Sequence, residues 1–355
     1  MDVKSVWWNK LAVSTELIEG ITDALYEKNT VLMNCHKPVP WEDTFFETVK
    51  RAISGISSVK TLEVVNDDVA DDPGEIILKR FCSAEVQSRY WINDPYAKFF
   101  YSEKSIPLHK RYVWVRGVES EERLDKWLAF VREYNSFFEA DEVEERAVFI
   151  FESSTGKFSR KRDEDACLCL EYNYDNFDVY KYSVFCVSGL EYSSLLKQYL
   201  AELVLSLSDN NVELCGALAT HGFDLAQDTL EIFSKEADKI GKFFKASGVG
   251  VDDYVKSKMI MAQTKIVFPV LEATRSEIIK KYYSGLLGYL PLRNVFGEAI
   301  NEPFDLEWTE LRHLLNRIPG DIPEKPLVEE CRLVRNQIAH NTVLSYNKIL
   351  QILQG

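Results

Sequence analysis

The feature that most constrains the fold is a series of short, mainly apolar segments in the first half of the chain. The clearest are Thr30–Asn34, Tyr112–Val118 and Ala147–Phe151, which are rich in β-branched and aromatic residues. Parallel strands have such runs because helices cover both faces of their sheet. The stretches between these segments have helical periodicity, so we expect an α/β domain with a mostly parallel sheet and flanking helices.

The same patterns predict the other elements of this domain. Ser120, which precedes two glutamates, is expected to cap a helix. Three more strands are expected at Val59–Val65, Ala166–Tyr172 and Tyr182–Val187, and three helices at Asp43–Ile53, Ser120–Phe138 and Leu190–Leu205.

The second half of the chain has a different pattern, which is helical almost throughout from about Val212. A break that contains two glycines, Ser247–Val251, indicates a boundary. We therefore expect an α/β domain over residues 1–210, a helical connector or lid over 211–252, and an all-α domain over 253–355.

The first strand–loop–helix unit lies where a nucleotide-binding fold places its phosphate loop. Its loop, Cys35–Trp41, has no glycine, and neither Gly-x-x-x-x-Gly-Lys-Ser/Thr nor Gly-x-Gly-x-x-Gly occurs in the chain. Such motifs let backbone amides approach the phosphates closely. The layout resembles an AAA-type or P-loop-type ATPase core that has lost its phosphate loop, and we expect no ATP hydrolysis and no nucleotide cofactor.

Composition excludes several classes of protein. The net charge of −14 argues against a broad nucleic-acid-coating surface and leaves room only for a local basic cleft. No apolar run is long enough to cross a membrane and the N-terminus has no signal-peptide pattern, so we expect a cytoplasmic protein. The seven scattered cysteines favour buried thiols over a metal site. The acidic segment Asp67–Asp72 also favours a solvated loop over a metal site.

The segment Arg335–His340, which reads Arg-Asn-Gln-Ile-Ala-His, carries the most specific chemical signal. It is the only Arg-x-x-x-x-His in the chain. Pro326 indicates the first turn of its helix. At about 100° per residue, we expect an apolar stripe of Leu327, Cys331, Val334 and Ile338, and an opposite face of Arg332, Arg335, Asn336, Ala339 and His340.

These side chains have the chemistry to cleave RNA without a metal. A histidine can take the proton of a 2′-hydroxyl nucleophile, and an arginine can stabilise the charge that develops on the phosphate. We interpret Arg335 and His340 as the catalytic pair and Asn336 as a residue that orients them, and we expect Arg332 and Arg312 to bind the substrate. The alternative is that the motif makes capping or interface hydrogen bonds and lies in a dimer seam.

The fuller motif, Arg-Asn-x-x-Ala-His, resembles the signature of the HEPN superfamily. The resemblance covers about residues 255–355 and implies a compact helical bundle. It also implies a homodimeric, metal-independent endoribonuclease, with Arg335 and His340 in a composite site at the dimer interface. Such domains occur in prokaryotic antiphage defence and toxin–antitoxin systems.

The sequence is therefore compatible with two functions. The first is a ribonuclease effector of a prokaryotic defence or toxin system, which binds RNA through a local basic cleft, forms a homodimer and has defence-system protein partners. The second is a non-catalytic regulatory or scaffold protein, in which the ATPase-like domain and an inert HEPN-like domain bind other proteins. Neither function needs a metal, a cofactor or a membrane.

Overall fold

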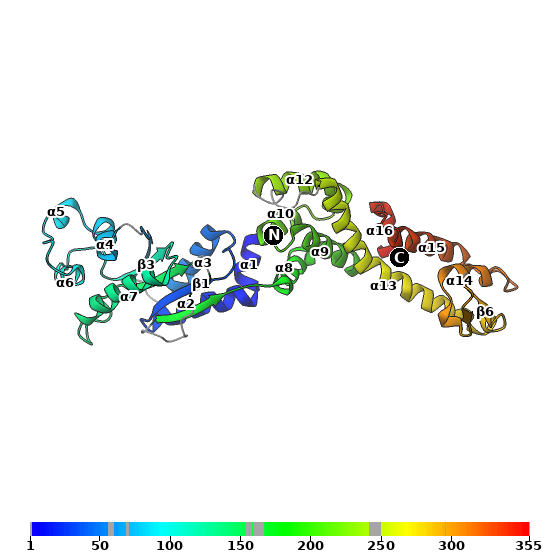
Figure 1. Cartoon of the computed structure of the whole chain (residues 1–355), viewed down its shortest axis with the longest axis horizontal. Coiled ribbons are helices and arrows are strands. Elements are labelled where there is room, and N and C mark those ends of the chain that lie inside the picture. Colours follow the sequence, from blue (N-terminus) through cyan, green and yellow to red (C-terminus); the bar gives the residue numbers. More distant parts are fainter. Residues whose placement is uncertain are drawn as a thin grey trace. The chain divides into compact units, whose positions relative to one another are not determined.

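The chain forms two compact units, residues 2–178 and residues 179–355 (Figure 1). The computed structural model describes residues 2–55, 60–68, 71–153, 156, 158, 167–240, 250–294 and 296–354. Val59, Ala166 and residues 247–249, which belong to predicted elements or boundaries, lie outside the described residues.

Within the described residues, the first unit contains a five-stranded sheet in which every pairing is parallel. The prediction of a mostly parallel sheet with flanking helices is therefore confirmed. The central strands are buried on both faces, which explains their continuous apolar sequences. The strands are β1 (Thr30–Cys35), β2 (Thr61–Asn66), β3 (Arg111–Arg116), β4 (Val148–Ser153) and β5 (Cys167–Tyr172), in the order β2-β3-β4-β1-β5.

Helices cover both faces of this sheet. On one face, Trp127 of α7 contacts Phe151 of β4 within an extensive apolar core. On the other, Phe45 of α3 contacts both Trp8 of α1 and Trp114 of β3. The helices are α1 (Val3–Lys10), α2 (Ala12–Tyr26), α3 (Glu42–Ser54), α4 (Pro73–Phe81), α5 (Ala84–Gln87), α6 (Tyr96–Ser102) and α7 (Glu121–Ser136).

The segment after β2 is not the fully solvated acidic loop that the sequence suggested. The side chain of Asp67 is completely buried and accepts hydrogen bonds from Arg123 and from the Trp127 indole, the latter at 2.9 Å. Arg123 lies in the first turn of α7, whose N-cap is Ser120 as predicted. A buried aspartate is tolerated here because a buried arginine and an indole N–H both bind it.

The second unit is largely helical, as predicted. Its elements are α8 (Asn176–Ser188, which begins in the first unit), α9 (Ser194–Ser208), α10 (Val212–Ala219), α11 (Asp224–Gln227), α12 (Thr229–Ile240), α13 (Val251–Leu287), β6 (Leu292–Arg293), β7 (Ala299–Ile300), η2 (Pro303–Asp305), α14 (Trp308–Leu315), α15 (Lys325–Ala339) and α16 (Tyr346–Gln354).

One predicted strand is wrong, because residues 182–187 lie in helix α8. The buried positions of α8 include Tyr182, Ser183, Cys186 and Val187, which are spaced as on one face of a helix. A short apolar run does not distinguish a buried strand from such a face. Helix α9 also lies within the range expected for the α/β domain, but it packs against α10, α13 and α16 of the second unit.

Long helix α13 anchors the segments that carry the motif. The buried side chain of Gln263 donates to the carbonyl of Leu344 at 3.1 Å and accepts from its N–H at 2.9 Å. Arg275 donates to the carbonyls of Phe304 and Leu306 at 3.1 and 2.7 Å. The connections that follow α15 and precede α14 are thereby fixed to one scaffold.

No helix within the described residues is long and apolar enough to cross a membrane. All seven cysteines are buried, which confirms the prediction of buried thiols. Cys167 and Cys169 lie on alternate positions of β5, as the strand period requires.

Candidate functional site

Helix α15 presents the motif as the sequence predicts, with one change. Cys331, Val334 and Ile338 are buried, but Leu327 is 43% exposed and Val328 is buried in its place. Residues three and four positions before Cys331 both lie near its face of the helix, so the sequence did not distinguish them. The buried stripe leaves the motif side chains on the outside of the helix.

The motif ends at the C-terminus of α15. His340 is the C-cap residue, and its backbone N–H donates to the carbonyl of Asn336 at 3.0 Å. Asn341 follows in the left-handed conformation, with φ of 53°, which stops the helix. The His340 side chain is exposed and, within the described part of the chain, has no hydrogen-bond or ion-pair partner.

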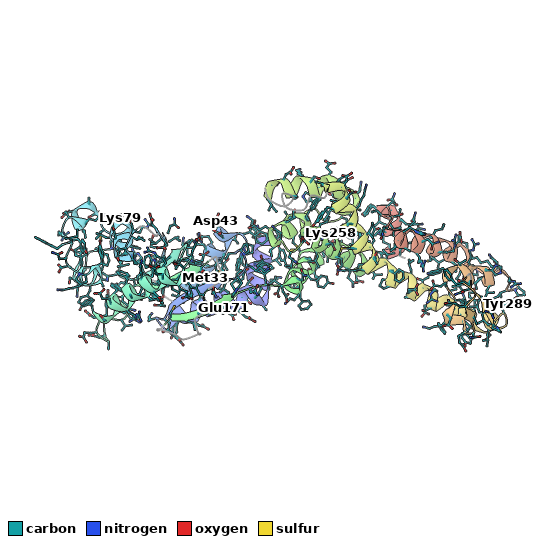
Figure 2. The ribbon with its side chains drawn as sticks, viewed as in Figure 1. Met33, Asp43, Lys79, Glu171, Lys258 and Tyr289 are labelled. Atoms are coloured by element: carbon teal, nitrogen blue, oxygen red, sulfur yellow. The ribbon has the colours of Figure 1, made fainter. Side chains whose placement is uncertain are left out.

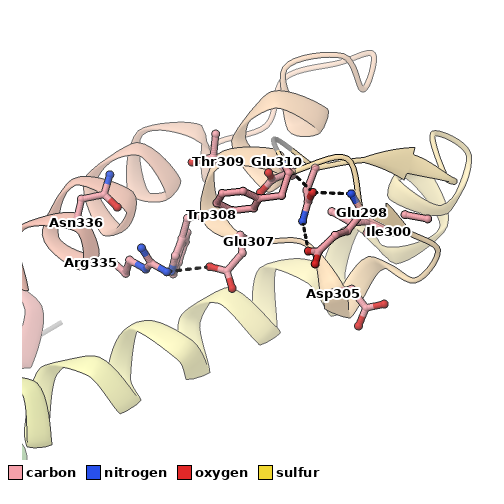
Figure 3. Close-up of a pocket in the computed structure, with 12 residues that line it drawn as sticks. Glu298, Ile300, Asp305, Glu307, Trp308, Thr309, Glu310, Arg335 and Asn336 are labelled. Atoms are coloured by element: carbon pink, nitrogen blue, oxygen red, sulfur yellow. Dashed lines mark hydrogen bonds and ion pairs between the residues drawn. The ribbon is translucent and has the colours of Figure 1, made fainter. Parts of the chain in front are cut away.

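Among the described residues, Arg335 has one ionic partner. Its Nη2 lies 3.5 Å from a carboxylate oxygen of Glu307, the residue that precedes α14 (Figure 3). The two side chains are 36% and 63% exposed. An exposed pair with one long contact contributes about 0–1 kcal/mol, so Arg335 can exchange this carboxylate for a phosphate at little cost.

The two arginines expected to bind substrate meet around a carboxylate rather than around His340. Glu329 accepts hydrogen bonds from Arg332 at 2.8 and 3.0 Å and from Arg312 at 3.0 Å. The Arg332 guanidinium first, and then that of Arg312, lower the pKa of Glu329 to about 2. Both arginines therefore have a fully charged competitor for any phosphate.

A pocket of about 400 Å³ lies beside the motif, and Arg335 and Asn336 form part of its wall (Figure 3). His340 is not among its lining residues. The rest of the wall comes from the β6–β7 hairpin, from Asp305 of η2, and from the start of α14 with Glu307 before it. Four carboxylates line the pocket, from Glu298, Asp305, Glu307 and Glu310. The pocket is thus negatively charged although an arginine lines it.

Two polar atoms of residues that line this pocket are buried away from solvent and have no partner within the described residues. They are the indole Nε1 of Trp308, a residue only 2% exposed, and Oε2 of Glu310. Leaving such a donor or acceptor unpaired costs about 1–3 kcal/mol. Sequence reasoning missed this pocket. The density of acidic residues around a tryptophan between residues 298 and 310 was the only local signal for it.

The carboxyl edge of the parallel sheet holds a second group of polar side chains. Glu171 of β5, which is labelled in Figure 2, is in register with Asn34 of β1. It accepts the Asn34 amide at 2.9 Å and also binds His36. Burial opposes ionisation of Glu171, but hydrogen bonds from Asn34 and His36 lower its pKa below the ordinary value. Burial first, and then the charges of Glu152 and Glu171, raise the pKa of the Cys35 thiol to about 12.

The loop between β1 and α3 cannot hold a phosphate in the manner of a phosphate loop. Pro38 and Pro40 have no N–H to donate, and Glu42 and Asp43 occupy the first turn of α3, where an anion would bind. In the sheet, Glu152 of β4 accepts a hydrogen bond from the indole N–H of Trp114 in β3 at 2.8 Å. These residues do not fit a nucleotide cofactor.

The described residues contain no group of three histidine, cysteine, aspartate or glutamate side chains placed to hold a metal ion. A search of protein-family models found no match to this chain, and neither did a search of curated proteins, so the functional inference rests on the side chains described above.

Proposed function

We propose that the chain is a metal-independent endoribonuclease of HEPN type in which Arg335 and His340 act on the phosphodiester. The proposal is supported by the end of α15, where an exposed histidine follows an arginine that makes a single weak ion pair within the part of the chain that the structure describes. Asn336 lies one helical turn before His340, and its carbonyl fixes the backbone of that residue.

In the proposed reaction, the His340 imidazole removes the proton of the 2′-hydroxyl. The 2′-oxygen then forms a bond to phosphorus, and the bond from phosphorus to the 5′-oxygen breaks. The partner subunit's His340, in its protonated form, gives a proton to the leaving 5′-oxygen. The products are a 2′,3′-cyclic phosphate and a 5′-hydroxyl. A second copy is needed because one chain offers one such histidine in the motif.

Arg335 is proposed to stabilise the negative charge that develops on the phosphate oxygens. A guanidinium can bind a phosphate through two hydrogen bonds, which are stronger than its single 3.5 Å contact with Glu307. Asn336 orients the phosphate or the histidine. Arg332 and Arg312 are proposed as weaker substrate contacts, since Glu329 holds both of them.

The charges around the motif restrict how RNA can approach. The acidic pocket beside Arg335 repels phosphates, as does the net charge of −14 on the whole chain. We infer that RNA contacts the exposed end of α15 near His340 and stays outside the pocket. Binding is then expected to be weak and selective rather than broad.

We place this activity in a cytoplasmic, homodimeric effector of a prokaryotic antiphage defence or toxin system. The α/β unit is proposed to be a degenerate ATPase-like scaffold that binds partner proteins. A second candidate is a non-catalytic scaffold protein, and the pairing of Arg335, Arg332 and Arg312 with glutamates favours it. In that case the motif only shapes an interface.

The product chemistry separates the two candidates. Purified protein is incubated with a structured RNA in EDTA, and the cleaved ends are identified by mass spectrometry. Ends with 2′,3′-cyclic phosphate and 5′-hydroxyl groups, and full resistance of the 2′-O-methylated RNA, are expected. Persistent integrity of the unmodified RNA over a range of protein concentrations, or cleavage of the methylated RNA, contradicts the proposed ribonuclease.

A further inference from the structure

We propose that the amino edge of the parallel sheet, where its strands begin, binds a phosphate monoester through Lys28, Lys60 and Arg146. Each of these residues stands one or two positions before a strand, namely β1, β2 and β4. Because parallel strands all begin at the same edge of their sheet, the topology brings the three cations to one edge. This edge is opposite to the carboxyl edge, whose loop after β1 does not fit a phosphate.

Hydrogen bonds join the three residues. The Arg146 guanidinium donates to the carbonyl of Lys28 at 3.2 Å, and the Lys60 ammonium donates to the carbonyl of Arg146 at 3.3 Å. The Lys60 ammonium also lies over the ring of Tyr112, 5.6 Å from its centre. Lys60 is only 6% exposed, and Tyr112 is fully buried beneath it. The three cations therefore come from separate connections and are held together before any ligand binds.

The carboxylates near this edge do not neutralise its cations. Within the described residues, Arg146 makes no ion pair, and its guanidinium, which has five donors, makes one hydrogen bond. Lys28 binds Glu144 at 3.1 Å, but Glu144 is 73% exposed, and such a pair can exchange its carboxylate for another anion at little cost. The carboxylate of Glu145 binds a different lysine, Lys110, at 2.9 Å. The edge therefore has local positive charge in a chain whose net charge is −14.

The amine of Lys60 responds to this excess of positive charge. Burial first, and then the charge of Lys28, lower the pKa of Lys60 to about 8, and Arg146 lowers it further. Glu144 and Glu145 act in the opposite direction without offsetting these effects. A charged lysine that is buried beside other cations is unfavourable, and a bound anion removes this cost. Groups that burial and specific charges perturb in this way are typical of functional sites.

The donors at this edge favour a phosphate monoester over other anions. A guanidinium can bind two phosphate oxygens at once, and an ammonium binds phosphate as a point charge. A phosphate monoester carries a charge of about −1.5 to −2 at pH 7 and has three terminal oxygens, so it can accept from three residues. A carboxylate or an RNA phosphodiester has a single negative charge and only two free oxygens. A sugar phosphate and a phosphorylated side chain both supply the required group.

The test is isothermal titration calorimetry of the full chain with ribose 5-phosphate at pH 8. Arg146→Gln and Lys60→Met are each expected to weaken binding at least ~10-fold, because each removes a charge-assisted hydrogen bond. The matched control is Lys126→Gln, which removes an exposed lysine of α7 that pairs with Glu122 and should leave the affinity unchanged. The dinucleotide UpU, whose only phosphate is a diester, should bind at least ~10-fold more weakly than ribose 5-phosphate.

Proton uptake separates a binding site from a purely structural group of cations. A bound anion raises the pKa of Lys60 from about 8, so the wild type should take up protons on binding at pH 8. Titrations in buffers of different ionisation enthalpy measure this uptake, which should be absent in Lys60→Met. The measurement on the wild type alone keeps the proposal testable if either variant fails to fold by circular dichroism.

A further arm identifies the source of the phosphate. The peptide acetyl-Gly-phosphoserine-Gly-amide is titrated beside ribose 5-phosphate, and binding of either one that depends on Arg146 supports the site. The proposal is overturned if neither probe binds, if folded Arg146→Gln binds as tightly as the wild type, or if the wild type takes up no protons at pH 8. Binding of UpU as tight as that of ribose 5-phosphate also overturns it. None of these measurements depends on RNA cleavage, so this site and the proposed ribonuclease can fail independently.

Discussion

The carboxyl edge of the parallel sheet and the end of α15 both contain charged side chains, but the two groups differ in burial and in how many partners bind them. At the sheet edge, Asp67 and Glu152 are each bound by an arginine and by an indole N–H, in buried or largely buried surroundings. At the end of α15, Arg335 has one exposed partner, and the His340 side chain has none within the described residues.

This difference indicates which polar groups stabilise the fold. Buried charges persist when they satisfy each other, and removing one partner leaves the other uncompensated. Exposed groups without strong partners contribute little to stability and stay free to bind a substrate. The buried ion pairs at the sheet edge, where nucleotide-binding folds bind ligands, are thus expected to tolerate substitution poorly, and the α15 motif is expected to tolerate it well.

The largest effect is expected for Arg123→Ala. The substitution leaves Asp67 buried without its arginine, so the free energy of unfolding should fall by about 3–5 kcal/mol. Urea unfolding can be followed by tryptophan fluorescence, because six of the seven tryptophans lie in residues 2–178. A loss below about 1 kcal/mol would mean that this pair is no more structural than an exposed one.

Arg335→Ala is expected to leave stability almost unchanged and to reduce activity. The one ion pair that Arg335 makes with a described residue is exposed, so the free energy of unfolding should change by less than about 1 kcal/mol. The rate of RNA cleavage should fall about 10²–10³-fold, since a charge-stabilising donor is lost. Arg317→Ala, an exposed arginine of the same unit outside the pocket and motif, serves as the control. Similar rates for both variants would remove Arg335 from the chemistry.

The smallest effect concerns Glu329, which is partly exposed and bound by two arginines. The pKa of this carboxylate is lowered from the ordinary 4.5 to about 2. Its stabilising contribution is therefore present above pH 4.5 and is lost as the pH falls through about 2. Comparing the unfolding of wild type and Glu329→Gln from pH 5 to pH 2 should show a difference that disappears at the acidic end. A difference that is constant over this range contradicts the assignment.

The sequence predicted the elements whose stabilisation is local. Apolar runs identified the strands of the sheet but misassigned residues 182–187 of α8, and helical spacing identified the stripe of α15 except at Leu327. Contacts between distant segments could not be predicted from the sequence. The burial of Asp67 depends on Arg123, 56 residues away. The pocket forms only because residues 294–310 pack beside Arg335 and Asn336.

The candidate site was predictable as a set of residue types and not as an arrangement. Helical spacing correctly placed Arg335 and Asn336 on an open face of α15. It did not reveal that Glu307 binds Arg335, or that Glu329 joins Arg312 to Arg332. These partners come from other elements or from side-chain conformations that a single sequence does not specify.

The most direct test compares two histidines, one from each region. RNA cleavage in EDTA is measured for His340→Ala and for His36→Ala, which removes a partly exposed histidine bound to Glu171 at the sheet edge. We predict a rate loss of about 10²–10⁴-fold for His340→Ala and no significant change for His36→Ala, with both proteins folded by circular dichroism. Undiminished cleavage by His340→Ala, or an equal loss in both variants, would contradict the assignment of the chemistry to the end of α15.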